Sequence, residues 1–244
     1  MTRAITALIC LLLAFAGGSS ALAATAPKVA PAQELVQLFG TQSVHATPGG
    51  AVEASVGDRR PLTGEATVLP VLSSVIDNSV DKSGQLWLQV RLPGRVLGVK
   101  TPPATGWINA SGSSTLISST GWHLVVDLAA RRVLVYDNGA QVRSYPAIVG
   151  KPSTPTPTGE YFVEENVTMP AHAPGAPFAL ATSDRSAVFH SFEGGPGQIA
   201  IHGLENLGGT LGTAASHGCI RLATSAITWL AARITPGTPL TIVS

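Results

Sequence analysis

Short runs of β-forming residues alternate with turn residues along the first half of the chain. Within Gln85–Arg91 the apolar residues Leu86, Leu88 and Val90 share one face, as in a half-buried strand. Similar strand-like runs are Val68–Val71, Leu86–Leu92 and Gly106–Ile108, and turn-forming residues separate them. The pattern predicts a small all-β module over residues 42–112.

A second β-rich part follows the Ser/Thr-rich residues 111–119. It contains the strand-like runs His123–Leu128, Arg132–Tyr136 and Gln141–Val149, and Asp137-Asn138-Gly139 predicts a hairpin between the last two. Further on, apolar residues recur at helical spacing between an N-cap at Thr224 or Ser225 and a stop at Pro236 and Gly237: Ile227, Leu230, Ala231 and Ile234. A final strand is expected at Leu240–Val243. The fold class is therefore mainly β with one late helix.

The first residues predict export from the cell. Arg3 precedes the apolar run Ala4–Ala16, and Ala21-Leu22-Ala23 is typical of a signal-peptide cleavage site. We expect residues 1–23 to be a signal peptide and residues 24–41 a flexible Ala/Pro-rich tether. The mature protein would then reside in the cell wall or a periplasm-like space. It would contact the membrane only if the signal segment stays uncleaved, which the sequence leaves open.

Charge and cysteine content narrow the function. The 15 Lys and Arg nearly balance the 14 Asp and Glu, with no basic block, so binding to nucleic acid or to an anionic membrane surface is not expected. Of the two cysteines, Cys10 lies in the signal segment. Cys219 is therefore the only thiol expected in the mature protein, and it has no disulfide partner there.

The stretch Ile199–Leu222 brings that thiol close in sequence to two imidazoles and a guanidinium. If His217–Arg221 is extended, then His217, Cys219 and Arg221 point to one side, and a Gly-rich loop would let His202 approach from a neighbouring strand. A thiol with an imidazole in hydrogen-bond reach is the arrangement needed for nucleophilic catalysis.

Such a thiol needs a neighbouring group that favours the thiolate, because only about 3% of a thiol with a pKa near 8.5 is ionised at pH 7. We expect an imidazolium contact and Arg221 to lower the pKa of Cys219 by about two units. The N–H groups around Gly218 and Cys219 are candidates for an oxyanion hole, and the Gly203 carbonyl is a candidate to orient His202.

These residues carry a family resemblance. IHG followed by SHGCIRL resembles the signature of YkuD-type L,D-transpeptidases, LVVDLAARRVLVYDNG resembles the opening hairpin of that domain, and GKPSTPTPTGEYFV resembles its Pro/Thr-rich loop. The resemblance covers His123–Ser244 and implies a YkuD-like β-sandwich catalytic domain over residues 120–244. The strand around Trp87, with the Pro-rich turns and Gly106-Trp107-Ile108 after it, resembles bacterial SH3-like modules.

The resemblance also implies roles for single residues. Cys219 would be the nucleophile, His202 the general base and Gly203 its backbone orienter, with Gly218 and Cys219 forming the oxyanion hole. Ser216, His217 and Arg221 complete the signature and are assigned to substrate binding. The thiolate would attack a stem tetrapeptide of peptidoglycan and expel D-Ala, and a diamino-acid amine would resolve the thioester. No cofactor is implied, and carbapenem-type β-lactams are expected inhibitors.

Other interpretations stay open. Water could replace the amine, which gives an L,D-carboxypeptidase or a cross-link hydrolase, and a noncatalytic wall-binding protein is a further alternative. Zinc bound by His202, His217 and Cys219 is another. Arg221 could pair with Glu205, His217 and His190 could be structural, and Glu164 and Glu165 are interpreted as solvated charges. The sequence does not decide the acceptor, the role of the SH3-like module or the oligomeric state.

Overall fold

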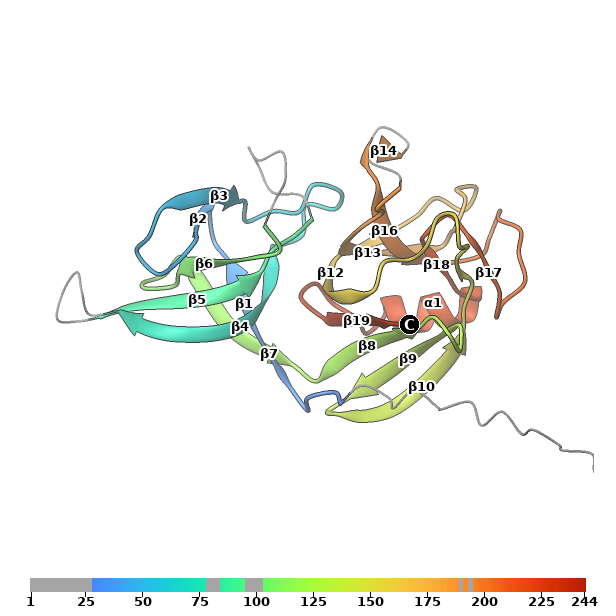
Figure 1. Cartoon of the computed structure of the whole chain (residues 1–244), viewed down its shortest axis with the longest axis horizontal. Helices are drawn as coiled ribbons and strands as arrows, with labels where there is room; N and C mark the ends of the chain where they lie inside the picture. Colours follow the sequence, from blue (N-terminus) through green and yellow to red (C-terminus); the bar gives the residue numbers. More distant parts are fainter. Residues whose placement is uncertain (1–27, 78–83, 95–102, 189–190, 193–194) are drawn as a thin grey trace, which may run out of the picture.

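The computed structural model of the chain describes residues 28–77, 84–94, 103–188, 191–192 and 195–244 (Figure 1). The expected signal peptide, residues 1–23, and His190 lie outside the described residues, so export stays a prediction. Within the described part of the chain, no helix is long and apolar enough to cross a bilayer.

The N-terminal strands form one seven-stranded sheet. Its order is β3 (Val52–Val56), β2 (Gln42–His45), β6 (Thr105–Asn109), β5 (Gln85–Arg91), β4 (Val68–Asp77), β1 (Gln33–Leu38) and β7 (Thr115–Thr120). The three strand-like runs of the sequence correspond to β4, β5 and β6.

The structure differs from the sequence expectation at both ends of this sheet. The tether expected over residues 24–41 includes β1, which pairs with both β4 and β7. Alternating apolar residues explain the strand, since Val36 and Leu38 are buried in the core of this unit. The sheet consequently begins before Gln42 and continues beyond residue 112. Its likeness to an SH3 module stays a prediction.

The C-terminal strands form an eight-stranded sheet with two short ladders beside it. The order is β10 (Ala140–Pro146), β9 (Arg132–Asp137), β8 (Trp122–Asp127), β19 (Pro239–Val243), β12 (Gly159–Thr168), β13 (Phe178–Arg185), β16 (Gln198–His202) and β18 (Ile220–Arg221). The ladders pair β11 (Val149–Gly150) with β17 (Ala214–Ser216) and β14 (Ser191–Phe192) with β15 (Gly195–Pro196). Asn138 and Gly139 have φ of 51° and 78°, which confirms the predicted hairpin turn.

Strand β12 joins the two halves of this large sheet. Its first residues, 159–162, pair with β19, and residues 163–168 pair with β13, with a bulge between Val163 and Glu165. The two halves face each other over one apolar core that also receives Ala226, Ile227 and Leu230 of helix α1 (Thr224–Ala231). The mainly β sandwich with one late helix is confirmed. The expected N-cap is wrong, because Ala223 caps α1 without a side-chain hydrogen bond.

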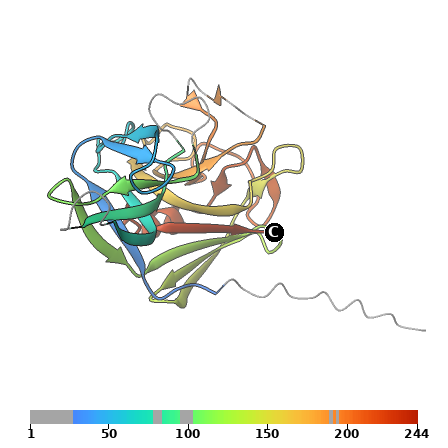
Figure 2. The ribbon, with the colours of Figure 1, turned by 60° about the vertical axis from the view of Figure 1, so that its left-hand side comes forward.

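The two units share a buried junction (Figures 1 and 2). Phe162 of β12 is 1% exposed and belongs to the core of the N-terminal unit. The neighbouring Glu164 and Glu165, interpreted from the sequence as solvated, are 1% and 0% exposed, so that interpretation is wrong. The bulge in β12 turns both carboxylates towards the N-terminal unit, because the extra residue breaks the alternation of side chains.

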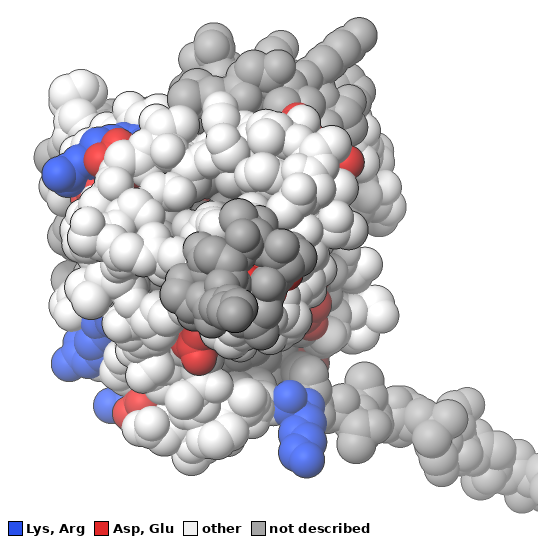
Figure 3. Space-filling model, turned by 90° about the vertical axis from the view of Figure 1, so that its left-hand side faces the viewer, with Lys and Arg blue, Asp and Glu red and all other residues white. Residues whose placement is uncertain are grey.

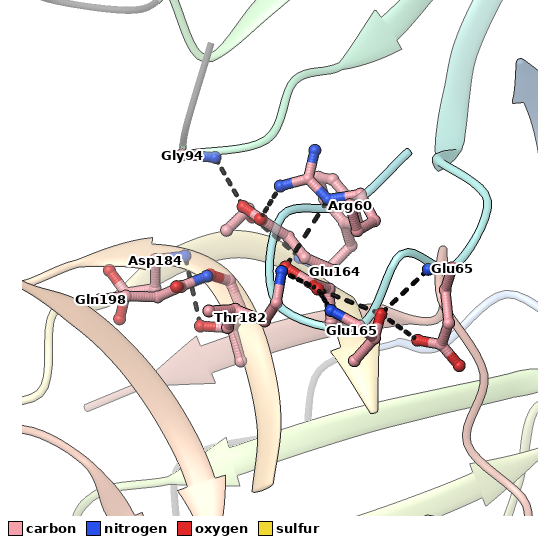
Figure 4. Close-up of polar contacts among 12 residues, drawn as sticks. Arg60, Glu65, Gly94, Glu164, Glu165, Thr182, Asp184 and Gln198 are labelled. Atoms are coloured by element: carbon pink, nitrogen blue, oxygen red, sulfur yellow. Dashed lines mark hydrogen bonds and ion pairs between the residues drawn. The ribbon is translucent and has the colours of Figure 1, made fainter. Parts of the chain in front are cut away.

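Polar groups of the N-terminal unit contact both carboxylates (Figure 4). Glu164 is ion-paired with Arg60 and accepts a hydrogen bond of 2.6 Å from the Gly94 N–H. Glu165 accepts hydrogen bonds of 2.8 Å from each of the N–H groups of Leu62 and Thr63. The N-terminal unit is therefore fixed to the strand that leads towards the candidate site.

The outer face of the N-terminal unit is mostly uncharged. On the face shown in Figure 3, Lys and Arg side chains are scattered, and Asp and Glu lie among them. Among the described residues seen on this face, positive charge is not concentrated at one place.

Candidate active site

His202 is the last residue of β16, and Cys219 directly precedes β18, the parallel strand beside β16 in the C-terminal sheet. Ile201 pairs with Ile220 and His202 pairs with Arg221. Ile201 and Ile220 are 0% exposed and face the core. Because side chains alternate along a strand, His202 and Cys219 both point to the opposite face. Cys219 is a free cysteine and is partly exposed there.

His202 is held by a backbone carbonyl. Its Nδ1 lies 2.8 Å from the carbonyl oxygen of Gly203, and Nδ1–H donates in the tautomer that this contact favours. Nε2 is then an acceptor. Burial lowers the pKa of His202, the charge of Arg221 lowers it further, and the Gly203 hydrogen bond acts in the other direction. A neutral imidazole at pH 7 with an unprotonated Nε2 has the form of a base.

Sequence reasoning missed Gly175, which supports this ring. Its carbonyl accepts the N–H of Gly203 at 2.9 Å. It has φ of 89°, and a Cβ atom on it would lie 2.5 Å from His202 Nδ1. The only sequence signal is a glycine within Pro174-Gly175-Ala176-Pro177.

We predict that Gly175→Ala lowers the rate of acylation at Cys219 by about 10²-fold. The added methyl group would lie only 2.5 Å from His202 Nδ1, so the imidazole must move away from its position. Gly212→Ala is the matched control, since Gly212 has φ of 84° and a Cβ atom on it would meet nothing within 4 Å. Mass spectrometry of the acylated protein measures both. Equal losses in the two variants would show that backbone strain, and not the ring contact, is responsible.

The turn before Cys219 departs from the expected extended segment. Gly218 has φ of 123°, and residues 217–218 form a bend between β17 and β18, so His217 does not share a strand face with Cys219. His217 is exposed, and its Nε2 lies 3.4 Å from Lys151 Nζ. The single face proposed for His217, Cys219 and Arg221 is therefore wrong for His217.

Ser216 shapes this turn from inside. It is 0% exposed, and its hydroxyl donates to the Cys219 carbonyl at 2.6 Å and accepts the Gly218 N–H at 3.1 Å. A direct contact of Ser216 with a substrate does not fit this burial. The Gly218 N–H is already engaged, which leaves the Cys219 N–H as the remaining donor of the oxyanion hole expected from the sequence.

The Pro/Thr-rich loop fixes the same turn from the other side. The hydroxyl of Thr156 donates to the Gly218 carbonyl at 2.6 Å, and the hydroxyl of Thr154 donates to the Ser216 carbonyl at 3.2 Å. The sequence indicated a stiff loop at Ser153–Thr158 but not these contacts. They hold Cys219 at the start of β18.

Burial decides the protonation of the thiol. It raises the pKa of Cys219, and the opposing effects of the Ala200 backbone hydrogen bond and the Arg221 charge are smaller. The expected lowering by about two units is therefore wrong, and the resting thiol is protonated at neutral pH. Arg221 donates to the Gly208 carbonyl at 3.1 Å. No ion pair joins it to Glu205 within the described residues.

The described part of the chain contains no group of three His, Cys, Asp or Glu residues placed to hold a metal ion. The arrangement at Cys219 consists of a protonated thiol, a neutral imidazole on the same face and a guanidinium beside both. These groups suit acyl transfer through a thioester.

Known proteins resemble the chain over this part. A 31% identity over 121 residues relates it to the putative L,D-transpeptidase YkuD of Bacillus subtilis, covering 50% of this chain and 65% of that protein. L,D-transpeptidase 1 of Mycobacterium tuberculosis is 28% identical over 134 residues, which cover 49% of each chain. The chain thus spans less than two thirds of the length of these relatives.

Among solved structures, an L,D-transpeptidase from Mycobacterium smegmatis is 20% identical, with a TM-score of 0.42 over 86% of this chain and 99% of that one. The L,D-transpeptidase LdtMt1 in complex with imipenem is also 20% identical, with a TM-score of 0.43 over 72% of this chain and 90% of that one. A family model described as the L,D-transpeptidase catalytic domain, YkuD, matches residues 121–242, half of the chain. The chain therefore belongs to the YkuD family of L,D-transpeptidases.

Proposed function

We propose that this protein is an exported peptidoglycan L,D-transpeptidase that forms cross-links through a thioester on Cys219. The observation that carries the proposal is the position of His202 at the end of β16, beside the parallel strand β18 that Cys219 directly precedes. Membership of the YkuD family supports the reaction class. The apolar segment and Ala21-Leu22-Ala23 at the start of the chain support export.

The first half-reaction consumes the donor peptide. His202 Nε2 takes the thiol proton as Cys219 Sγ attacks the carbonyl carbon of a stem tetrapeptide. The Cys219 N–H stabilises the oxyanion, and a donor of this kind lowers a barrier by about 3 to 4 kcal/mol. The C–N bond to D-Ala then breaks, and His202 returns the proton to the departing amine. A thioester remains on the enzyme.

The second half-reaction makes the cross-link. A neutral side-chain amine of a second stem peptide attacks the thioester carbon, and its proton passes to His202. The C–S bond breaks, and Cys219 leaves as a thiolate that recovers the proton from His202. The products are an amide bond and the starting enzyme. Water in place of the amine gives a tripeptide by the same sequence of steps.

Incubation of wild-type protein and Cys219→Ala with disaccharide-tetrapeptide tests the proposal. Mass spectrometry of the wild type should find the acylated protein together with cross-linked dimers and free D-Ala, and the variant should give none of these. Tripeptide without dimers would instead identify an L,D-carboxypeptidase. Absence of any acylated wild-type protein would contradict a thioester mechanism.

We further predict that carbapenem-type β-lactams acylate Cys219, because their strained amide presents a comparable carbonyl to the thiol. A structure of a relative in complex with imipenem supports this choice of inhibitor. Imipenem should add one adduct mass to the wild type and none to Cys219→Ala. An adduct that forms on both proteins would place the reaction elsewhere.

A further inference from the structure

Side-chain hydroxyls hold three consecutive peptide groups around Cys219. Ser216 holds the two outer groups, because its Oγ accepts the Gly218 N–H at 3.1 Å and its hydroxyl donates to the Cys219 carbonyl at 2.6 Å. Thr156 holds the middle group, because its hydroxyl donates to the Gly218 carbonyl at 2.6 Å. This middle peptide group joins Gly218 to Cys219. It therefore carries both the carbonyl that Thr156 contacts and the N–H that stabilises the oxyanion.

The middle peptide group transmits the position of Thr156 to the reacting centre. A peptide group is planar and trans, so its carbonyl and its N–H point in opposite directions. Thr156 holds the carbonyl towards the Pro/Thr-rich loop, and the Cys219 N–H consequently points away from that loop. Thr156 is 3% exposed, so the loop side of the turn is closed to a substrate. Cys219 is partly exposed, which leaves the opposite side for the reacting carbonyl.

The Thr156 hydroxyl has a fixed direction. Its Oγ1 accepts the Gly150 N–H at 2.9 Å, and its single proton is donated to the Gly218 carbonyl. Gly150 belongs to β11 and pairs with Ser216 of β17. A Cβ atom on Gly150 would lie 2.4 Å from the Thr156 nitrogen, so the loop packs directly against this strand. The hydroxyl is thus positioned by the same short ladder that leads into the turn before Cys219.

We infer that Thr156 is a positioning residue for the oxyanion in both half-reactions. Its hydrogen bond sets the direction of the Cys219 N–H. It also polarises the peptide group, because a carbonyl that accepts a hydrogen bond makes the N–H of the same peptide a stronger donor. The inference rests on the proposed function and adds to it a residue of the Pro/Thr-rich loop that acts through the backbone.

Thr154 provides a comparison within the same loop. It is 6% exposed, and its hydroxyl donates to the Ser216 carbonyl at 3.2 Å. That carbonyl also accepts the Lys151 N–H at 3.0 Å. Its peptide group ends at the N–H of His217 and not at that of Cys219. Removal of the Thr154 hydroxyl should therefore leave the oxyanion donor in place.

The test compares two reactions of Cys219. Imipenem acylates the thiol through a tetrahedral oxyanion, whereas iodoacetamide alkylates it by displacement of iodide from a CH₂ group, and no oxyanion forms. Thr156→Val keeps the shape of the side chain and removes its hydroxyl. In this variant imipenem adduct formation should slow by about 10- to 100-fold, while iodoacetamide alkylation changes by less than about twofold. Mass spectrometry of the peptide that contains Cys219 follows both reactions.

Further variants keep the test decisive. Thr156→Ser retains the hydroxyl and should keep most of the imipenem rate. Thr154→Val, the matched control, should change both rates by less than about twofold, because no oxyanion donor is displaced. Thr156→Ala removes the same hydrogen bond without the added methyl group, and it should show the same selective loss if Thr156→Val does not fold. With disaccharide-tetrapeptide, the loss should appear in kcat and not in KM, because the oxyanion exists only during the reaction.

The outcomes separate this inference from the proposed function. Equal losses in the imipenem and iodoacetamide reactions of Thr156→Val would overturn the inference, since they would mean that Thr156 only maintains the structure of the turn. A wild-type imipenem rate in Thr156→Val would also overturn it. In both cases acylation of the wild-type protein leaves the proposed function intact. If the wild type is alkylated by iodoacetamide but acylated by neither imipenem nor the tetrapeptide, the proposed function is overturned and the inference with it.

Discussion

Arg60→Met is expected to lower the free energy of unfolding by about 3 to 5 kcal/mol, a drop in melting temperature on the order of 10 °C. The change keeps most of the side-chain volume but removes the cation between Glu164 and Glu165, which are almost fully buried. Burial already raises the pKa of Glu164, and Arg60 is the strongest of the groups that oppose this. Without it a buried charge is left uncompensated, or Glu164 must take up a proton. Denaturant unfolding at neutral pH measures the loss.

The neighbouring Arg59 provides the matched control. Its side chain is exposed and makes one contact of 3.4 Å with the Gly64 carbonyl, so Arg59→Met should change stability by less than about 0.5 kcal/mol. Combining Arg60→Met with Glu164→Gln should recover part of the loss, because the amide needs no cation. A loss in Arg60→Met no larger than that in Arg59→Met would mean that the junction does not hold the two units together.

The burial of Glu164 and Glu165 at the junction could not be predicted from the sequence. Glu164 and Glu165 occur in a polar-looking stretch, and their partners Arg60, Leu62 and Gly94 are about 70 to 104 residues away in sequence. Local pattern carries no information about such distant pairing. The bulge that turns both carboxylates to one side breaks the two-residue period from which burial is inferred.

Features with a local cause were predicted well. The Asp137-Asn138-Gly139 hairpin depends on positive φ at two adjacent positions, and helix α1 depends on the spacing of apolar residues. Both can therefore be predicted from a short stretch of sequence. β1 was missed because Ala- and Pro-rich neighbours hid the alternation of Val36 and Leu38. The difference lies in whether the stabilising contacts are near in sequence.

At the candidate active site, too, features with local causes were predictable and features that depend on distant contacts were not. The sequence predicts that His202 approaches Cys219 from a neighbouring strand, and in the structure His202 of β16 pairs with Arg221 of β18, which Cys219 directly precedes. It did not reveal the bend at His217, the support from Gly175 and Thr156, or the direction of the thiol pKa. Each of these depends on burial and on contacts between distant loops, which raise the pKa of a thiol even when a guanidinium is near.

His202→Ala is expected to slow acylation of Cys219 at pH 7 by about 10² to 10⁴-fold. Burial raises the pKa of the thiol and lowers that of the imidazole, so the resting pair is neutral and the proton must move during the attack. With the base removed, only thiolate already present can react. The rate of the variant should therefore rise about tenfold for each pH unit below the thiol pKa, whereas the rate of the wild type levels off once the imidazole is deprotonated.

The two pH profiles, measured as the rate of imipenem adduct formation, distinguish a base from a structural histidine. If His202 served only to pack against Gly175 and Gly203, its removal would lower the rate by the same factor at every pH, and added imidazole would not restore it. Exposed His172, which lies outside the arrangement, is the control, and His172→Ala should follow the wild-type profile. A profile of His202→Ala parallel to the wild type would refute the assignment of His202 as the base.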